Sequence, residues 1–313
     1  MPMMGPGTGP EDVAVETYGC TDVGRKRRRN EDQFLIAQVN RSLTVRSTSV
    51  SPDVQRWLSS SSEGTVLLVA DGMGGAGDGD VASAVAVKAI ADYLCNAMPS
   101  ADPAAVAQSR IHQDRTLPGV RMGLAAALEQ GDAEVRRAAG GTRGRRKLGT
   151  TLTMAYIVYP QMYVAHAGDS RAYLLRRQQL TQLTTDHTYA EKYRGKGNAP
   201  PPSSDWHHML WNALGGAGSA ILEPEVRRVP LKPYDLVLLC SDGLTKYLSK
   251  EAIAAVLNSE HTLPLACQRL IAMANEAGGS DNTTVVAARC TPPAPPSSAG
   301  TPVPAPSGSY PGY

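Results

Sequence analysis

Hydrophobic and polar residues follow one another along the chain in patterns that separate strands from helices. Residues 12–20 alternate with a period of two, which is typical of a half-buried strand. Residues 34–39 and 65–70 are short apolar runs between polar turns and predict two buried strands. The segments 79–98, rich in Ala and Val, and 120–139 are long and contain no proline, so they predict two helices.

The second half of the chain predicts strands first and helices afterwards. Strands are expected over residues 150–159, 162–166, 171–176, 225–229, 235–240 and 283–289, and helices over 250–258 and 264–277. Because strands and helices do not alternate strictly, this order disfavours a doubly wound parallel sheet. It suits an α+β protein in which two sheets are flanked by helices.

Three segments are too polar or too rich in proline to belong to this pattern. Residues 1–10 hold three Pro and three Gly, and residues 291–313 hold eight Pro and no charge, so both ends are expected to be flexible. Residues 40–63 contain seven Ser between Ser47 and Ser62 and predict a loop insertion. The remaining span, residues 11–290, is expected to form one domain.

Composition and charge exclude several classes of protein. The 313 residues are 42% hydrophobic, which permits a core, and the formal net charge is only +2. Near-neutral charge and a single Phe argue against nucleic-acid binding. Since no run of about eighteen apolar residues occurs, no membrane span is expected. Five scattered Cys without a Cys-x-x-Cys pair favour the reducing cytoplasm.

Acidic residues recur at the ends of the predicted strands. Asp71 follows the apolar run 65–70 and precedes a glycine-rich turn, and Asp242 follows the strand 235–240 within Ser-Asp-Gly. Strand-end carboxylates are also found at Asp169, Asp281 and the adjacent pair Glu31 and Asp32. A set of oxygen ligands without matching His or Cys favours Mg²⁺ or Mn²⁺. Any one Asp-Gly could be an ordinary turn, but the joint pattern predicts a metal site.

The order of these motifs resembles the metal-dependent protein phosphatases (PPM family), the type 2C Ser/Thr phosphatases, in their bacterial form. The matching stretches are Thr21-Asp22-Val23-Gly24, Asn30-Glu31-Asp32, Val69-Ala70-Asp71-Gly72-Met73-Gly74-Gly75, Leu148-Gly149-Thr150-Thr151, His166-Ala167-Gly168-Asp169-Ser170-Arg171, Leu183-Thr184-Thr185-Asp186-His187, Ala213-Leu214-Gly215-Gly216, Cys240-Ser241-Asp242-Gly243-Leu244 and Ser280-Asp281-Asn282. Each motif alone is weak, whereas the combined set over residues 21–282 is specific.

The resemblance implies a four-layer α-β-β-α sandwich of two antiparallel sheets flanked by helices, with two Mn²⁺ or Mg²⁺ ions at one edge. It implies that Asp71 bridges the two ions and that the backbone carbonyl of Gly72 is a ligand. Glu31, Asp242 and Asp281 complete the metal shell, and Asp32 holds metal-bound water. The reaction implied is attack on phosphorus by a hydroxide bridging the metals, without a covalent intermediate.

A basic cluster at residues 25–29 precedes the Glu-Asp pair. On spacing alone Arg25, Arg27, Arg28 and Arg29 are equivalent, and all could be solvated bases; the register of the resemblance selects Arg27 as the group that binds the substrate phosphate.

Three departures from the family pattern affect the prediction. Met73 stands where eukaryotic members have a His proposed as general acid, as is usual in bacterial members. Lys246 replaces an Asp that helps many members to bind a third cation; Asp169 with Asp242 could still reach such an ion, or the Lys ammonium could fill its place. The flap, here residues 188–218, contains three consecutive prolines and the pair His207 and His208.

Histidines have two interpretations. His207 and His208 could act as a general acid or metal ligand, but a surface contact of the flap is favoured. His166 is expected to pack in the core, and His187 is expected to end a turn into the flap without a catalytic role.

The resemblance thus implies a cytoplasmic, monomeric phosphatase acting on phospho-Ser and phospho-Thr proteins, including a partner Ser/Thr kinase. The sequence leaves two alternatives open. One is a regulatory pseudophosphatase that binds phosphoproteins with little turnover, and the other is a hydrolase of small phosphate esters.

Overall fold

The computed structural model of the chain describes residues 13–39, 64–74, 78–98, 118–140, 148–194, 205–216 and 221–292. The predicted N-terminal segment 1–10, the loop insertion 40–63 and all but two residues of the tail 291–313 lie outside these residues. The predictions made for those three segments therefore remain predictions.

One sheet contains five strands. Its order is β1 (Ala14–Asp22), β11 (Thr283–Thr291), β10 (Leu236–Cys240), β7 (Arg171–Arg176) and β8 (Gln179–Gln182), and every neighbouring pair is antiparallel. Strands β1 and β11, the first and the last among the described residues, are partners, and Asp22 lies opposite Thr283.

The other sheet is also antiparallel. Its order is β2 (Asp32–Val39), β3 (Gly64–Met73), β5 (Leu152–Val158), β6 (Gln161–Ala167) and β9 (Glu225–Pro230), and the short strand β4 (Gly149–Thr150) pairs with the end of β3. The alternation of side chains sends one face of each strand towards the first sheet and the other face towards helices.

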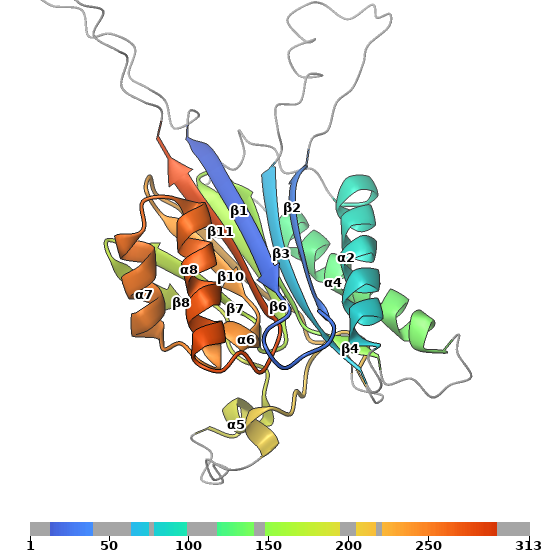
Figure 1. Cartoon of the computed structure of the whole chain (residues 1–313). Coiled ribbons are helices and arrows are strands. Elements are labelled where there is room, and N and C mark those ends of the chain that lie inside the picture. The colour runs from blue at the N-terminus through green and yellow to red at the C-terminus, as the bar shows by residue number, and fades with distance from the viewer. Residues whose placement is uncertain are drawn as a thin grey trace, which may run out of the picture.

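Three hydrophobic clusters separate the four layers of the fold: one lies between the two sheets, and one lies between each sheet and its helices. Leu67 and Val164 of the second sheet pack with Leu174 and Val286 of the first sheet between the two sheets. The second sheet is covered by α2 (Gly79–Asn96) and α4 (Pro118–Gly140), and the first sheet by α7 (Lys250–Ser259) and α8 (Leu263–Glu276). Figure 1 shows these helices on opposite sides of the strands. The expected α-β-β-α sandwich is confirmed.

The predicted elements differ from the observed ones mainly where strands are short or interrupted. The strand predicted over 150–159 is divided into β4 and β5, because Thr151 leaves the ladder. Strand β8 was not predicted, since its sequence Gln-Leu-Thr-Gln holds one apolar residue. The one-turn helices α5 (Tyr189–Lys192) and α6 (Asp242–Thr245) and a 3₁₀ turn, Asp205–His207, were likewise missed.

Among the described residues, no helix combines the length and apolar character needed to cross a lipid bilayer.

Candidate metal centre

Several elements end at the same edge of the sandwich. The connection between β1 and β2, the strand β4 and the start of α6 lie at the lower end of the sheets in Figure 1. The predicted acidic residues belong to these ends, so the fold brings together side chains that are up to 250 positions apart in the sequence.

Asp32 and Asp71 face each other across β2 and β3. They are directly opposed in the antiparallel register, so their side chains lie on the same face of the sheet. Asp32 is 2% exposed, and its Oδ2 accepts hydrogen bonds of 2.7 Å from Ser241 Oγ and Thr284 Oγ1. Its other oxygen, Oδ1, is buried without a hydrogen-bond partner. Burial raises the pKa of Asp32 to about 6, against the effect of the two hydroxyl groups.

The backbone of Asp71 is held by Thr150, the last residue of β4, and by Thr151, which follows it. Asp71 N donates to Thr151 Oγ1 at 3.0 Å, and Asp71 O accepts from Thr151 N and Thr150 Oγ1, each at 2.9 Å. Burial raises the pKa of Asp71 well above its usual value, and the nearby charges of Asp32 and Asp242 raise it further. The carboxylate is therefore buried within a group of like charges, on a backbone that Thr150 and Thr151 hold in place.

Asp242 is the first residue of α6, and a glycine lets this helix approach the next strand. A Cβ on Gly243 would lie 1.9 Å from Asn282 O, so any side chain there would push the helix away. Burial raises the pKa of Asp242, and the charge of Asp281 adds to this; Lys246 and His208 act in the opposite direction.

Asp281 is the carboxylate to which the basic groups bind. Arg27 Nη2 lies 2.7 Å from Asp281 Oδ1, and Lys246 Nζ lies 3.6 Å from Asp281 Oδ2. Asn282 N also donates to Asp281 Oδ1 at 3.1 Å. Within the basic cluster, Arg27 is thus joined to the carboxylates, whereas Arg29 Nη1 lies 3.9 Å from Asp80 Oδ2. The structure brings Arg27, which the resemblance selected, into the candidate site.

Glu31 connects the site to the start of α2. Its Oε1 accepts from Gly79 N at 3.2 Å, and its backbone oxygen accepts from Gly72 N at 3.1 Å. A Cβ on Gly72 would lie 2.0 Å from Gly79 O. Because only glycine permits this approach, the end of β3 and the start of α2 meet at Glu31, the first at its backbone oxygen and the second at its side chain.

Asp169 enters the same group from the turn between β6 and β7. Burial raises its pKa to about 7, and the charge of Asp242 is the next largest cause. The structure thus brings Asp169 close to the predicted ligands. His207 and His208 are exposed, as expected for surface residues of the flap. Burial has the largest effect on the pKa of Asp242 and raises it, while the charge of His208 lowers it slightly.

These residues fit hard divalent cations. Burial and mutual repulsion raise the pKa values of Asp71, Asp32, Asp169 and Asp242, so the site disfavours its own negative charges. Asp32 Oδ1 is a buried acceptor without a donor. A dense set of carboxylate oxygens is the donor set that Mg²⁺ and Mn²⁺ prefer.

Sequence reasoning missed the residues that hold the ligands in place. Ser241, Thr284 and Asn282 support the carboxylates, and Asn282 Oδ1 accepts from Glu31 N at 2.8 Å while its Nδ2 donates to Val23 O and Arg29 O. Ser241 and Asn282 stood inside the quoted motifs, but nothing in the pattern indicated that their side chains fix other parts of the site.

The chain is similar in sequence and in fold to known proteins. The sequence model of the family described as protein phosphatase 2C matches residues 46–277. Serine/threonine phosphatase stp of Listeria monocytogenes is 32% identical over 224 residues, which cover 71% of this chain and 82% of that protein. The crystal structure of the Mycobacterium tuberculosis serine/threonine phosphatase PstP/Ppp is similar with a TM-score of 0.67 at 27% identity, over 89% of this chain and 99% of that one. A structure of the PstP catalytic domain in complex with two manganese ions has a TM-score of 0.63, with the same identity and coverage.

Proposed function

The chain belongs to the protein phosphatase 2C family of metal-dependent protein-serine/threonine phosphatases, and we propose that its catalytic centre is the carboxylate cluster around Asp71. The observation that carries this proposal is the position of Arg27. Its guanidinium group lies 2.7 Å from Asp281 and senses the charges of Glu31 and Asp71, so a phosphate-binding cation stands beside the candidate metal ligands.

We propose two ions, Mn²⁺ or Mg²⁺, held by Glu31, Asp71, the Gly72 carbonyl, Asp242 and Asp281. The manganese complex of PstP supports this count and this metal. Asp169 could reach a third ion, but the ammonium group of Lys246 lies 3.6 Å from Asp281 and weakens such a site. Bound divalent cations supply Lewis-acid polarisation of a phosphoryl group and make water more acidic.

The residues of the chain bind and orient the substrate. Arg27 is half exposed, with its side chain at 48% accessibility, so it can turn from Asp281 to an incoming phosphate and grip two of its oxygens. Asp32 is fixed through Oδ2 by two hydroxyl groups, which leaves Oδ1 to accept a hydrogen bond from water. Met73 has no proton to donate, so the leaving alcohol takes its proton from another donor.

We propose that the substrates are proteins phosphorylated on Ser or Thr, including a Ser/Thr kinase that the enzyme opposes. The relatives' names as Ser/Thr phosphatases support the substrate class. A monomer in the cytoplasm is part of the same proposal, and its five cysteines, all present as free thiols, agree with a reducing compartment.

The experiment is phosphate release from a phosphothreonine peptide after EDTA treatment, with Mn²⁺ or Mg²⁺ added back. Turnover that returns with the cation supports the proposal. A folded protein that binds the phosphopeptide but releases no phosphate with either ion would instead indicate a pseudophosphatase, which nothing in the comparisons supports. A generic aryl phosphate measured in parallel separates a phosphoprotein phosphatase from a hydrolase of small esters, since only the former prefers the peptide.

A further inference from the structure

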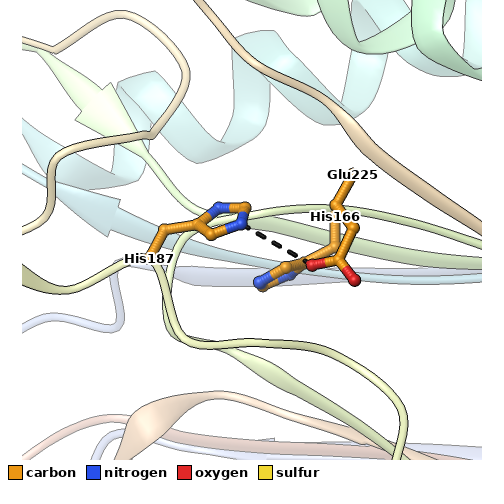
Figure 2. A group of neighbouring side chains, drawn as sticks. All are labelled: His166, His187 and Glu225. Carbon is orange, nitrogen blue, oxygen red and sulfur yellow. Dashed lines mark ion pairs between the residues drawn. The ribbon is translucent and has the colours of Figure 1, made fainter. Parts of the chain in front are cut away.

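A second group of titratable side chains lies beside the carboxylate cluster. His166 on β6 and Glu225 on β9 are directly opposed in the sheet, and His187 follows β8 at the start of the flap. The ligand atoms of the three residues lie within 4.8 Å of one another. Figure 2 shows the ring of His187 turned towards Glu225, with His187 Nε2 at 3.7 Å from Glu225 Oε2.

Hydrogen bonds argue against a metal in this group. His187 Nδ1 accepts from Gly168 N at 3.2 Å and from Asn212 Nδ2 at 2.9 Å, so the ring proton is on Nε2. The Asn212 amide is oriented by Glu223, whose N donates to Asn212 Oδ1 and whose O accepts from Asn212 Nδ2. Nε2 therefore carries a hydrogen directed at Glu225, and its lone pair is not available to a cation.

The ring of His166 packs against the ring of His187. Its Nε2 donates to Thr185 O at 3.1 Å, and its Nδ1 lies 2.9 Å from Thr153 Oγ1. The two imidazole rings are 4.7 Å apart between centroids. Burial lowers the pKa of His166 to about 4, so it is neutral at physiological pH. His166 is thus the packed core histidine that the sequence predicted.

On one side, His187 holds the turn that carries Asp169. His187 N donates to Gly168 O at 2.7 Å, while Gly168 N donates back to the ring, so the two residues are joined by two reciprocal hydrogen bonds. Gly168 has φ +122°, and a Cβ there would lie 2.6 Å from Thr151 Cβ. The next residue is Asp169, whose position therefore depends on this contact.

On the other side, His187 holds the returning end of the flap. Its backbone oxygen accepts from Trp211 N at 3.0 Å, its ring accepts from Asn212, and the Trp211 ring packs 4.9 Å from it. A bridge between Thr188 and Leu210 continues the pairing. The start of the flap, its residues 211–212 and the Asp169 turn thus meet at one residue, His187, through both its backbone and its ring.

We propose that His187 is a positioning residue, which couples the base of the flap to Asp169 and so sets where that carboxylate lies in the metal centre. The inference rests on the proposed metal centre for its effect on Mn²⁺ binding and on the proposed phosphatase activity for its consequence in turnover. It assigns a role to a residue that sequence reasoning left without one.

The experiment compares three variants of the full chain by Mn²⁺ binding in calorimetry and by kcat/KM on a phosphothreonine peptide. His187→Ala removes both hydrogen bonds that the ring accepts. It is expected to weaken the Mn²⁺-binding step that involves Asp169 by about 10-fold or more, as for residues that orient metal ligands, and to leave the ions held by the other carboxylates nearly unchanged. His187→Asn places an oxygen near the Nδ1 position, retains an acceptor for Gly168 and Asn212, and is expected to stay within about threefold of wild type. His187→Gln retains a donor towards Glu225 but no acceptor near Nδ1, and should resemble His187→Ala.

The matched control is His261→Ala, since His261 is an exposed histidine in the turn between α7 and α8. It should leave both quantities unchanged. Equal Mn²⁺ affinity in wild type and His187→Ala would overturn the inference. So would a His187→Gln protein with the Mn²⁺ affinity of wild type. A His187→Asn protein that fails to fold although it keeps the acceptor would also overturn it. A wild-type protein without turnover, but with the expected order of Mn²⁺ affinities, would contradict the proposed function and leave the coupling intact.

Discussion

Replacing Asp32 by Asn should make the metal-free protein more stable at alkaline pH. The substituted amide keeps an oxygen for Ser241 and Thr284, while it removes a negative charge that is 2% exposed and lies opposite Asp71. Burial raises the pKa of Asp32 from 3.8 to about 6 in the folded protein. An acidic group whose pKa is higher in the folded than in the unfolded protein contributes fully to the stability of the fold below its unfolded-state pKa. For Asp32, this contribution is lost as the pH rises through the folded-state pKa of about 6.

The size of the effect follows from that shift. Each pKa unit corresponds to ~1.4 kcal/mol, so the ionised Asp32 lowers the free energy of unfolding by ~3 kcal/mol at pH 8 and by little at pH 4. Asp32→Asn should remove this loss. For a domain of this size, such a gain raises Tm by about 5 °C. Asp32→Asn should at the same time lower turnover, because the carboxylate is proposed to hold water in the metal centre.

The assay is urea unfolding of both proteins in EDTA between pH 4 and pH 8. The variant and wild type should converge near pH 4 and separate as the pH rises. The control is Asp235→Asn, another buried aspartate at 1% exposure, whose Oδ1 instead accepts from Arg176 Nε at 2.8 Å. That variant should lose about 1.5–3 kcal/mol, since it breaks a charged hydrogen bond. An Asp32→Asn protein that is no more stable than wild type at pH 8 would refute the reasoning.

Other changes test single parts of the centre. Asp242→Ala should abolish phosphate release while circular dichroism shows an intact fold; retained activity would remove Asp242 from the metal shell. Gly243→Ala should lower both Tm and Mn²⁺ affinity, because its Cβ would lie 1.9 Å from Asn282 O; unchanged values would contradict the need for close approach. Arg27→Ala should raise KM for a phosphopeptide about 10- to 100-fold with Mn²⁺ affinity nearly unchanged; an equal loss of Mn²⁺ affinity in calorimetry would give Arg27 a structural role.

Periodicity located the long elements, because their patterns are local. The apolar run 65–70 and the proline-free segment 79–98 are visible without the rest of the chain, and they correspond to β3 and α2. Strand β8 could not be found in this way, since a four-residue edge strand with mostly polar residues has no pattern. Periodicity also could not predict the pairing of β1 with β11, because a local pattern carries no information about contacts between residues far apart in the sequence.

In the candidate site, too, the features carried by local motifs could be predicted, and the contacts between distant residues could not. Strand-end carboxylates predicted a metal site from their residue types, and the family resemblance assigned roles to Asp71 and Arg27 among them. The support of Asp32 by Ser241 and Thr284 joins residues 209 and 252 positions apart, so no local motif contained it. The same holds for His187, whose importance lies in hydrogen bonds to Gly168 and to the far end of the flap.

The most direct test of the central claim is phosphate release from a phosphothreonine peptide during a Mn²⁺ titration, with wild type and Asp71→Asn measured side by side. Asp71 lies at the centre of the carboxylate cluster, where the charges of its neighbours raise its pKa after the larger effect of burial. The account predicts that wild type gains activity with Mn²⁺ and that Asp71→Asn, although folded, remains inactive at every Mn²⁺ concentration. Cation-dependent turnover of normal size in Asp71→Asn would contradict the assignment of the catalytic centre to this cluster.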